Sequence, residues 1–147
     1  MTPTIRLATD QDGPAIGKLF AEAEYPDFGV DWTSAKVSGW WLVAETKDGQ
    51  LVGAVMLSCG QPYGYVGQLI VHPAWRAMNG QGEGRLTGRL GKVAYDLLIT
   101  AFVALRSAGS QMVVGAIGDG ENKALQAIYA RHGAANLGTF TLMGRRL

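Results

Sequence analysis

Near the C-terminal end of the chain, one segment places an amide and a phenol at a spacing that suits a helix. In the run ENKALQAIYARHGA, Tyr129 follows Asn122 by seven positions, and Gly133 follows Tyr129 by four. Asn122 can cap a helix by accepting from amides of its first turn, and Gly133 falls where a left-handed C-cap is expected. Seven positions are almost two turns, so both side chains lie within about 20–40° of each other and face one groove. A phenol in such a groove is a candidate proton donor; the alternative is a capped amphipathic helix with one buried tyrosine.

This segment resembles the last conserved helix of the GNAT superfamily of N-acetyltransferases, which has the pattern N-x-x-A-x-x-x-Y-x-x-x-G-F. Leu125 stands at the family's Ala position and Ala134 at its Phe position. The resemblance implies that Asn122 contacts the arm of coenzyme A. It also implies that Tyr129 is the catalytic residue, the general acid that protonates the departing thiolate.

Length and composition restrict the class of protein. A chain of 147 residues with 48% hydrophobic and 17% charged side chains fits one globular domain, residues 1–147. The single cysteine, Cys59, excludes an internal disulfide and is predicted to be a small buried hydrophobe. With only His72 and His132 beside it, no metal-ligand spacing occurs, so no metal is expected.

The charges are unevenly divided along the chain. Residues 1–72 carry four basic and eight acidic side chains, and residues 73–147 carry nine basic and four acidic ones. This division does not suit nucleic-acid binding, which needs a clustered basic face, but it suits a phosphorylated cofactor in one half and a cationic substrate near the other. Solvated surface charge is the alternative. Neither a signal peptide nor a membrane span is expected, so the cytoplasm is the predicted location, and a homodimer is compatible with the sequence.

Hydrophobic periodicity predicts alternating strands and helices. Strands are expected at residues 5–8, 41–46, 51–58, 65–71, 112–117 and 139–143. Four helices are expected: one that starts near Pro14, one from about Asp31, one from Leu90 to Gly109, and one from Asn122. This order predicts an α/β fold, and it resembles the GNAT fold over nearly the whole chain. The resemblance implies a mixed, mostly antiparallel central sheet flanked by helices on both faces, and acetyl-CoA as the cofactor.

The resemblance also implies a Gly-rich turn, R/Q-x-x-G-x-G/A, whose amides grip the pyrophosphate of coenzyme A. Two registers are open, one at Gly80-Gln-Gly82 and one at Arg85-Leu-Thr-Gly88-Arg-Leu90. We prefer the second register because a helix from Leu90 to Gly109 has an ordinary length. The residues expected to bind the cofactor are Leu69, Ile70 and Val71 through their main chain, Gly80, Gly82, Gly84, Arg85, Leu86, Thr87, Gly88 and Asn122.

In the family, the region after the first helix recognises the acceptor. Here it reads EAEYPDFGVDW, and acidic side chains interleaved with aromatic rings suit a cation. The expected acceptor-binding residues are Tyr25, Asp27, Phe28 and Trp32. No carboxylate occurs in the fourth strand, YVGQLIV, so the base is open, with water-mediated candidates at Glu24, Asp27, Glu45, Asp119 and Glu121. Direct attack by a neutral amine is equally allowed.

The sequence therefore predicts an acetyl-CoA-dependent N-acetyltransferase that acts on a small-molecule or peptide primary amine. The chief alternative is a non-catalytic sensor that binds coenzyme A or acyl-coenzyme A, or an interaction module on the same fold. A small structural protein without a cofactor is the third hypothesis. No other catalytic motif occurs, because the chain has neither a G-x-S-x-G elbow nor a P-loop.

Overall fold

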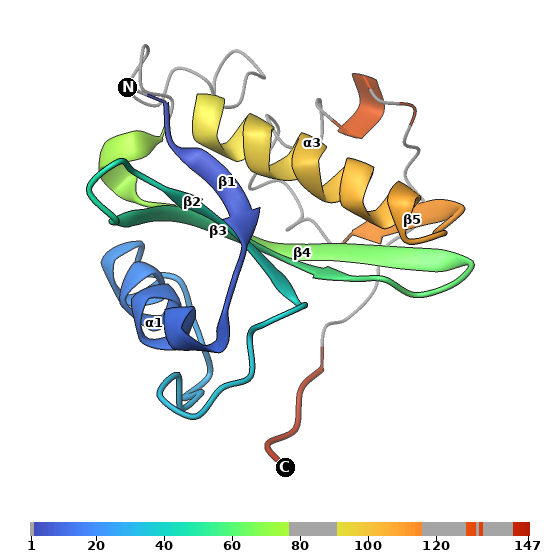
Figure 1. Cartoon of the computed structure of the whole chain (residues 1–147). Coiled ribbons are helices and arrows are strands. Elements are labelled where there is room, and N and C mark those ends of the chain that lie inside the picture. Colours follow the sequence, from blue (N-terminus) through green and yellow to red (C-terminus); the bar gives the residue numbers. More distant parts are fainter. Residues whose placement is uncertain (1, 77–90, 116–128, 132, 134–142) are drawn as a thin grey trace.

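The chain forms one twisted five-stranded sheet in the computed structural model, which describes residues 2–76, 91–115, 129–131, 133 and 143–147. The strands lie side by side in chain order (Figure 1). β4 and β5 are parallel, and every other neighbouring pair is antiparallel, so the sheet is mixed and mostly antiparallel as predicted. The strands are β1 (Thr4–Leu7), β2 (Trp41–Glu45), β3 (Leu51–Ser58), β4 (Tyr63–Val71) and β5 (Met112–Gly115).

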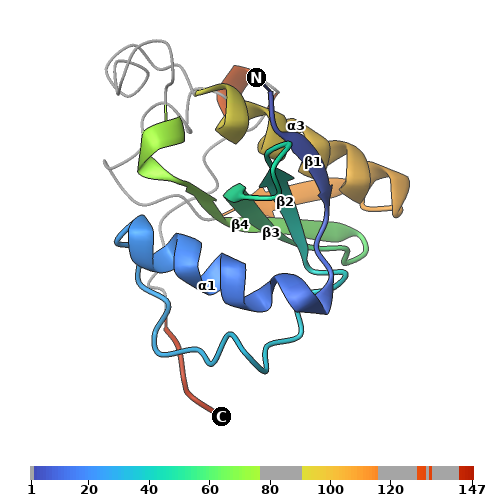
Figure 2. The ribbon, with the colours of Figure 1, turned by 60° about the vertical axis from the view of Figure 1, so that its left-hand side comes forward.

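Helices cover both faces of this sheet. α1 (Gly13–Glu22) lies against one face and α3 (Lys92–Ser107) against the other (Figures 1 and 2). The chain passes from β4 through α3 to β5, which is the crossover that a parallel pair requires. Two short 3-10 helices flank these elements, η1 (Asp10–Asp12) before α1 and η2 (Pro73–Trp75) after β4.

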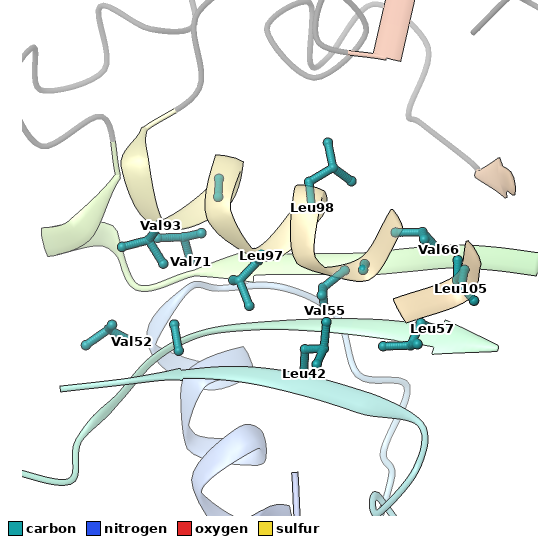
Figure 3. Close-up of a cluster of buried hydrophobic side chains, with 13 residues drawn as sticks. Leu42, Val52, Val55, Leu57, Val66, Val71, Val93, Leu97, Leu98 and Leu105 are labelled. Atoms are coloured by element: carbon teal, nitrogen blue, oxygen red, sulfur yellow. The ribbon is translucent and has the colours of Figure 1, made fainter. Parts of the chain in front are cut away.

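Each helix buries one apolar stripe against the sheet. On the α3 side, Leu97 and Leu105 are fully buried against strand residues such as Val55 and Leu57 (Figure 3). On the α1 side, an equivalent layer is formed by Ile16, Leu19, Phe20, Val43 and Ala54. Burial of these side chains is the main contribution to the stability of the domain.

A bulge interrupts β4 in the middle of the sheet. Ala54 pairs with Ile70 and Met56 with Gly67, so β4 carries one more residue than β3 between these pairs. Val66 and Val71 consequently both face α3, although they are five residues apart, while Ile70 faces α1. Simple alternation would put Val66 and Val71 on opposite faces. The extra residue lies at Gln68, whose φ of 52° is left-handed.

Several local predictions need correction. The helix expected from about Asp31 is wrong, since residues 23–40 form turns and irregular segments. The helix expected from Leu90 starts at Lys92, and Cys59 is exposed rather than buried. Residues 139–142 of the last expected strand and most of the Asn122 helix lie outside the described residues, whereas Met143 is described without strand structure and residues 129–131 are helical.

Candidate active site

Tyr129 lies beside the end of β5. Its ring packs edge-to-face on Phe102 of α3, with ring centroids 5.5 Å apart and planes at 72°. Its hydroxyl lies over Gly115, where an added Cβ would come within 2.7 Å of the hydroxyl oxygen and 3.1 Å of the Val66 carbonyl oxygen. Because Gly115 pairs with Val66, the phenol lies where the described pairing of β4 and β5 ends. A glycine at position 115 is therefore what lets the hydroxyl approach the sheet so closely.

The surroundings of Tyr129 keep its hydroxyl protonated. Burial raises the pKa of Tyr129 from 10.0 to about 12, and the nearby Tyr65 adds to the shift. Burial disfavours the charged form of any acid because the phenolate would lose its hydration. At neutral pH this side chain is consequently a hydrogen-bond donor in an environment that disfavours ions.

Tyr65 is a site residue that sequence reasoning missed. It lies in β4, and its ring covers Gly67, where an added Cβ would be 2.6 Å from both a ring carbon and the hydroxyl oxygen. Tyr65 pairs with Val114, one position before the Val66–Gly115 pair. The two tyrosines thus each lie over a glycine of neighbouring strands. A tyrosine two positions before a glycine in a strand was the only signal that could have indicated it.

The β4 residues predicted to bind the cofactor have side chains that belong to the core. Leu69 and Val71 pack on the α3 side and Ile70 on the α1 side, which leaves only their main chain for a ligand, as expected. The Val71 carbonyl oxygen already accepts a hydrogen bond from Arg76 Nε at 2.9 Å. Arg76 Nη2 also donates to the Ala23 carbonyl at 3.5 Å, so Arg76 connects the end of β4 to the end of α1.

The predicted pyrophosphate turn lies outside the described residues, as does Asn122. This holds for Gly80, Gly82, Gly84, Arg85, Leu86, Thr87 and Gly88. The start of α3 nevertheless bears on the register. Gly91 is its N-cap, with an extended ψ of 159°, so α3 does not continue back through Gly91. A continuous helix from Gly82, which the first register needs, is therefore inconsistent with this conformation.

The predicted acceptor-binding residues do not all face outward. Trp32 packs on Phe20 at a centroid distance of 4.9 Å and covers Gly17, where an added Cβ would be 2.6 Å from its ring. Its Nε1 donates to Asp27 Oδ2 at 3.0 Å, and the Gly29 amide donates to Asp27 Oδ1 at 3.0 Å. Both hydrogen bonds lower the pKa of Asp27, and the one from Trp32 has the larger effect. Trp32 thus holds the loop in place, and Asp27 stays ionised within it.

The tip of this loop is exposed and contacts the C-terminal segment. Phe28 is 75% exposed, and Tyr25 packs edge-to-face on Phe20 at 5.7 Å while its ring stays partly open to solvent. Arg146 Nη2 donates to the carbonyl oxygens of Phe28 and Gly29 at 3.1 and 3.3 Å. The loop therefore presents an aromatic ring and a carboxylate, as its sequence indicated, and the guanidinium of Arg146 lies against it.

One candidate base is excluded by its position. Glu45 lies in β2, two strands away from β4, and Arg6 Nε donates to its Oε2 at 2.6 Å. Glu24 is exposed in the left-handed region after α1, and Asp119 and Glu121 lie outside the described residues. Within the described ranges, no group of three or more His, Cys, Asp or Glu side chains is placed to hold a metal. None of the described helices is long and apolar enough to cross a membrane.

Comparison with solved structures identifies the fold. AAC(6')-Iy in complex with a coenzyme A bisubstrate analogue matches with a TM-score of 0.67 and 15% identity over 100% of both chains. A Mycobacterium tuberculosis protein in complex with CoA matches with a TM-score of 0.66 and 22% identity over 96% of this chain and 76% of that one. The ribosomal-protein-alanine N-acetyltransferase of Brucella melitensis matches with a TM-score of 0.65 and 17% identity over 98% and 100%.

No protein-family model and no curated protein matches the chain. At identities of 15–22%, the likeness to solved structures concerns the fold. The chain has the acyl-CoA N-acyltransferase fold of the GNAT acetyltransferases, and the resemblance inferred from the sequence is confirmed at that level.

Proposed function

We propose that this protein transfers the acetyl group of acetyl-CoA to a primary amine, with Tyr129 as the proton donor. The observation that carries the proposal is the hydroxyl of Tyr129, which lies over Gly115 where the described pairing of β4 and β5 ends. The resemblance to the GNAT family implies that the cofactor binds between β4 and β5, and its departing sulfur would then lie near this hydroxyl. The two solved structures that contain CoA or a CoA conjugate support the choice of cofactor.

Different residues of the chain would bind the cofactor and donate the proton. The main chain of Leu69, Ile70 and Val71 and the turn at 80–88 would hold the cofactor, together with Asn122. Acetyl-CoA supplies an activated thioester carbonyl. When the amine nitrogen attacks that carbonyl, a C–N bond forms and the C–S bond breaks. Tyr129 donates its proton to the sulfur and regains, through solvent, the proton that the nitrogen loses.

The raised pKa of Tyr129 sets a limit on this role. A thiol ordinarily titrates near 8.5, so transferring a proton from a phenol of pKa about 12 to a thiolate is unfavourable by itself. Tyr129 therefore hydrogen-bonds the sulfur as its negative charge develops, and the proton transfer is completed because the phenolate regains the proton that the nitrogen loses. Donors placed where charge develops in a dehydrated site contribute strongly to catalysis.

Replacing Tyr129 by phenylalanine tests this role. Tyr129→Phe keeps the ring on Phe102 and removes only the hydroxyl, so the affinity for acetyl-CoA should change little while the turnover number falls about 10²-fold. Tyr63→Phe is the matched control because Tyr63 is 60% exposed at the start of β4. An unchanged turnover number in Tyr129→Phe would assign the proton to water and leave Tyr129 a packing residue.

The acceptor is proposed to be a small or peptide amine that reaches the loop at 25–32. Asp27, ionised within the loop, and the exposed ring of Phe28 would attract a cationic part of the acceptor. AAC(6')-Iy, in its complex with an acetylneamine conjugate, gives one example of an amine handled by this fold. Thiol release should be measured with neamine, spermidine and an alanine-initiated peptide, and activity with none of them would contradict the proposed amine class.

The second candidate function is a non-catalytic sensor of coenzyme A or acyl-coenzyme A. The sequence of β4 favours it, since that strand contains no carboxylate that could serve as a base for the amine. Calorimetry and thiol release separate the two functions. A sensor binds acetyl-CoA without releasing thiol in the presence of amines, whereas the transferase does both.

A further inference from the structure

Gln68 in β4 combines two unfavourable features at a single position. Its φ of 52° is left-handed, a conformation that a side chain other than glycine rarely adopts inside a strand. Its Oε1 atom is buried, and no described residue gives it a hydrogen bond. A buried acceptor without a donor is costly, because the oxygen has lost its water and gained no partner.

The fold does not need glutamine at this position. The bulge requires an extra residue with positive φ between Gly67 and Leu69, and glycine would supply that conformation without strain. The burial pattern of β4 depends on the presence of one extra residue in the strand, not on the side-chain amide of Gln68. Strain and an unpaired polar group that coincide in one residue therefore point to a ligand that satisfies the amide when it binds.

The position of Gln68 indicates which ligand this is. Gln68 directly follows Gly67, and the ring of Tyr65 covers that glycine. Gln68 is also two positions beyond Val66, the last residue of β4 with a described partner in β5. At about 3.3 Å per residue, its main chain lies roughly 7 Å along β4 from the pair beside the Tyr129 hydroxyl. The amide thus belongs to the same small region of the sheet as the proposed proton donor.

We propose that Oε1 of Gln68 accepts a hydrogen bond from the N–H of the attacking amine and so makes Gln68 the residue that orients the acceptor nitrogen. This inference rests on the proposed function. An amide oxygen can hold an N–H but cannot take its proton, so the nitrogen must arrive uncharged with its lone pair free. The C–N bond then forms, the C–S bond breaks, and the one proton that the nitrogen loses is balanced by the proton that Tyr129 gives to the sulfur.

The proposal names a class of acceptor. A nitrogen that must be neutral on arrival favours weakly basic primary amines, such as the α-amine of a peptide with a pKa near 8, over alkylamines such as lysine with a pKa near 10.4. Burial around Tyr129 also favours weakly basic amines, because an ammonium group that enters the site loses its hydration.

Three substitutions of Gln68 test the proposal, with Gln111→Met as the control because Gln111 is exposed before β5. Gln68→Met keeps the shape and removes the acceptor. It should raise the KM for an alanine-initiated peptide by about tenfold, the scale of one lost hydrogen bond, and leave the Kd for acetyl-CoA within about twofold. Gln68→Glu keeps an acceptor and adds a base, so it should retain activity and move the acidic limb of the kcat/KM profile to lower pH. Gln68→Gly should raise the melting temperature of the free protein while lowering kcat/KM.

Each other result overturns the inference. A weaker Kd for acetyl-CoA in Gln68→Met would place the amide on the cofactor, and unchanged kinetics would leave it without a role. Lower melting temperatures in both Gln68→Met and Gln68→Gly would make it a structural residue. Loss of activity in Gln68→Glu would show that the buried end of the amide donates instead of accepting. If the unsubstituted protein binds no acetyl-CoA, the proposed function fails first, and this inference fails with it.

Discussion

At the scale of single residues, Tyr129 couples the stability of the fold to pH in the alkaline range. Its pKa is raised from 10.0 to about 12 in the folded state. Below pH 10 the phenol is neutral in both states, whereas between pH 10 and 12 only the unfolded state releases the proton. Stability is therefore lost as the pH rises through this window, by about 1–3 kcal/mol. The melting temperature of the wild type minus that of Tyr129→Phe should therefore fall from pH 8 to 12, and a constant difference would contradict the raised pKa.

Gly115 provides a second residue-scale prediction. An added Cβ would lie 2.7 Å from the Tyr129 hydroxyl oxygen, so Gly115→Ala must displace the phenol from the end of β5. Because a misplaced catalytic group costs much of its effect, the turnover number should fall by about 10²-fold. Gly144→Ala is the control, since an added Cβ there meets nothing within 4 Å. Full activity in Gly115→Ala would show that catalysis does not depend on this hydroxyl.

Residue-scale predictions could be made from the sequence only where a local pattern existed. Helical spacing singled out Tyr129, because seven positions fix a common face whatever the helix packs against. Tyr65 and Gln68 had no comparable pattern. Tyr65 matters because its ring covers Gly67, and Gln68 because a mismatch between β3 and β4 puts an extra residue there. Both features arise from strand pairing, which involves residues far apart in the sequence.

At the scale of elements, α1 and the loop that follows it act as one unit. Trp32 covers Gly17, and its Nε1 holds Asp27. Gly17→Ala would favour the helix by about 1 kcal/mol in isolation, but the added Cβ would be 2.6 Å from the indole ring. Overpacking typically costs about 1–3 kcal/mol, so the melting temperature should fall and the KM for the acceptor should rise.

The double variant Gly17→Ala with Trp32→Leu checks this cause. Removing the ring relieves the overlap, so the two changes should together cost less than the sum of the single changes. Additive costs would mean that Trp32 and Gly17 do not interact, and an unaltered acceptor KM in Gly17→Ala would separate the loop from the acceptor site.

The start of α3 leads to a prediction about the pyrophosphate turn. If residues 85–90 grip the pyrophosphate, Gly88→Asp places a carboxylate against it and should weaken acetyl-CoA binding by at least about tenfold. Gly80→Asp is the matched change in the other register and should have a much smaller effect. Calorimetry with acetyl-CoA measures both, and the reverse ranking would assign the turn to the first register.

Element boundaries followed from the sequence where alternation and turn chemistry agreed. Leu51–Ser58 was predicted to the residue, because an Asp-Gly turn fixes where that strand begins. The helix expected near Asp31 failed for a physical reason. Asp31 accepts from the Thr33 amide and from the hydroxyls of Thr33 and Ser34, at 3.1, 2.6 and 2.9 Å. These side-chain hydrogen bonds stabilise a turn in place of the first turn of a helix.

At the scale of the whole molecule, the fold places the proposed proton donor and the proposed acceptor loop on opposite sides of one sheet (Figure 2). α3 connects β4 to β5 and brings Phe102 beneath the ring of Tyr129, while the loop after α1 and Arg146 of the C-terminal segment meet on the opposite side of the sheet (Figure 2). A cofactor that binds only the folded state stabilises it by mass action. Acetyl-CoA at millimolar concentration should therefore raise the melting temperature, and no shift would count against a cofactor site.

The most direct test of the central claim is the stoichiometry of the products. The purified protein is incubated with acetyl-CoA and an alanine-initiated peptide, with neamine and spermidine in parallel. Free thiol is titrated while acetylated amine is counted by mass spectrometry. An acetyltransferase gives one acetylated amine for each thiol released, and Tyr129→Phe slows both by about the same 10²-fold. Binding of acetyl-CoA with no acetylated amine from any of these acceptors, or thiol release without acetylated amine, would contradict the proposed transfer.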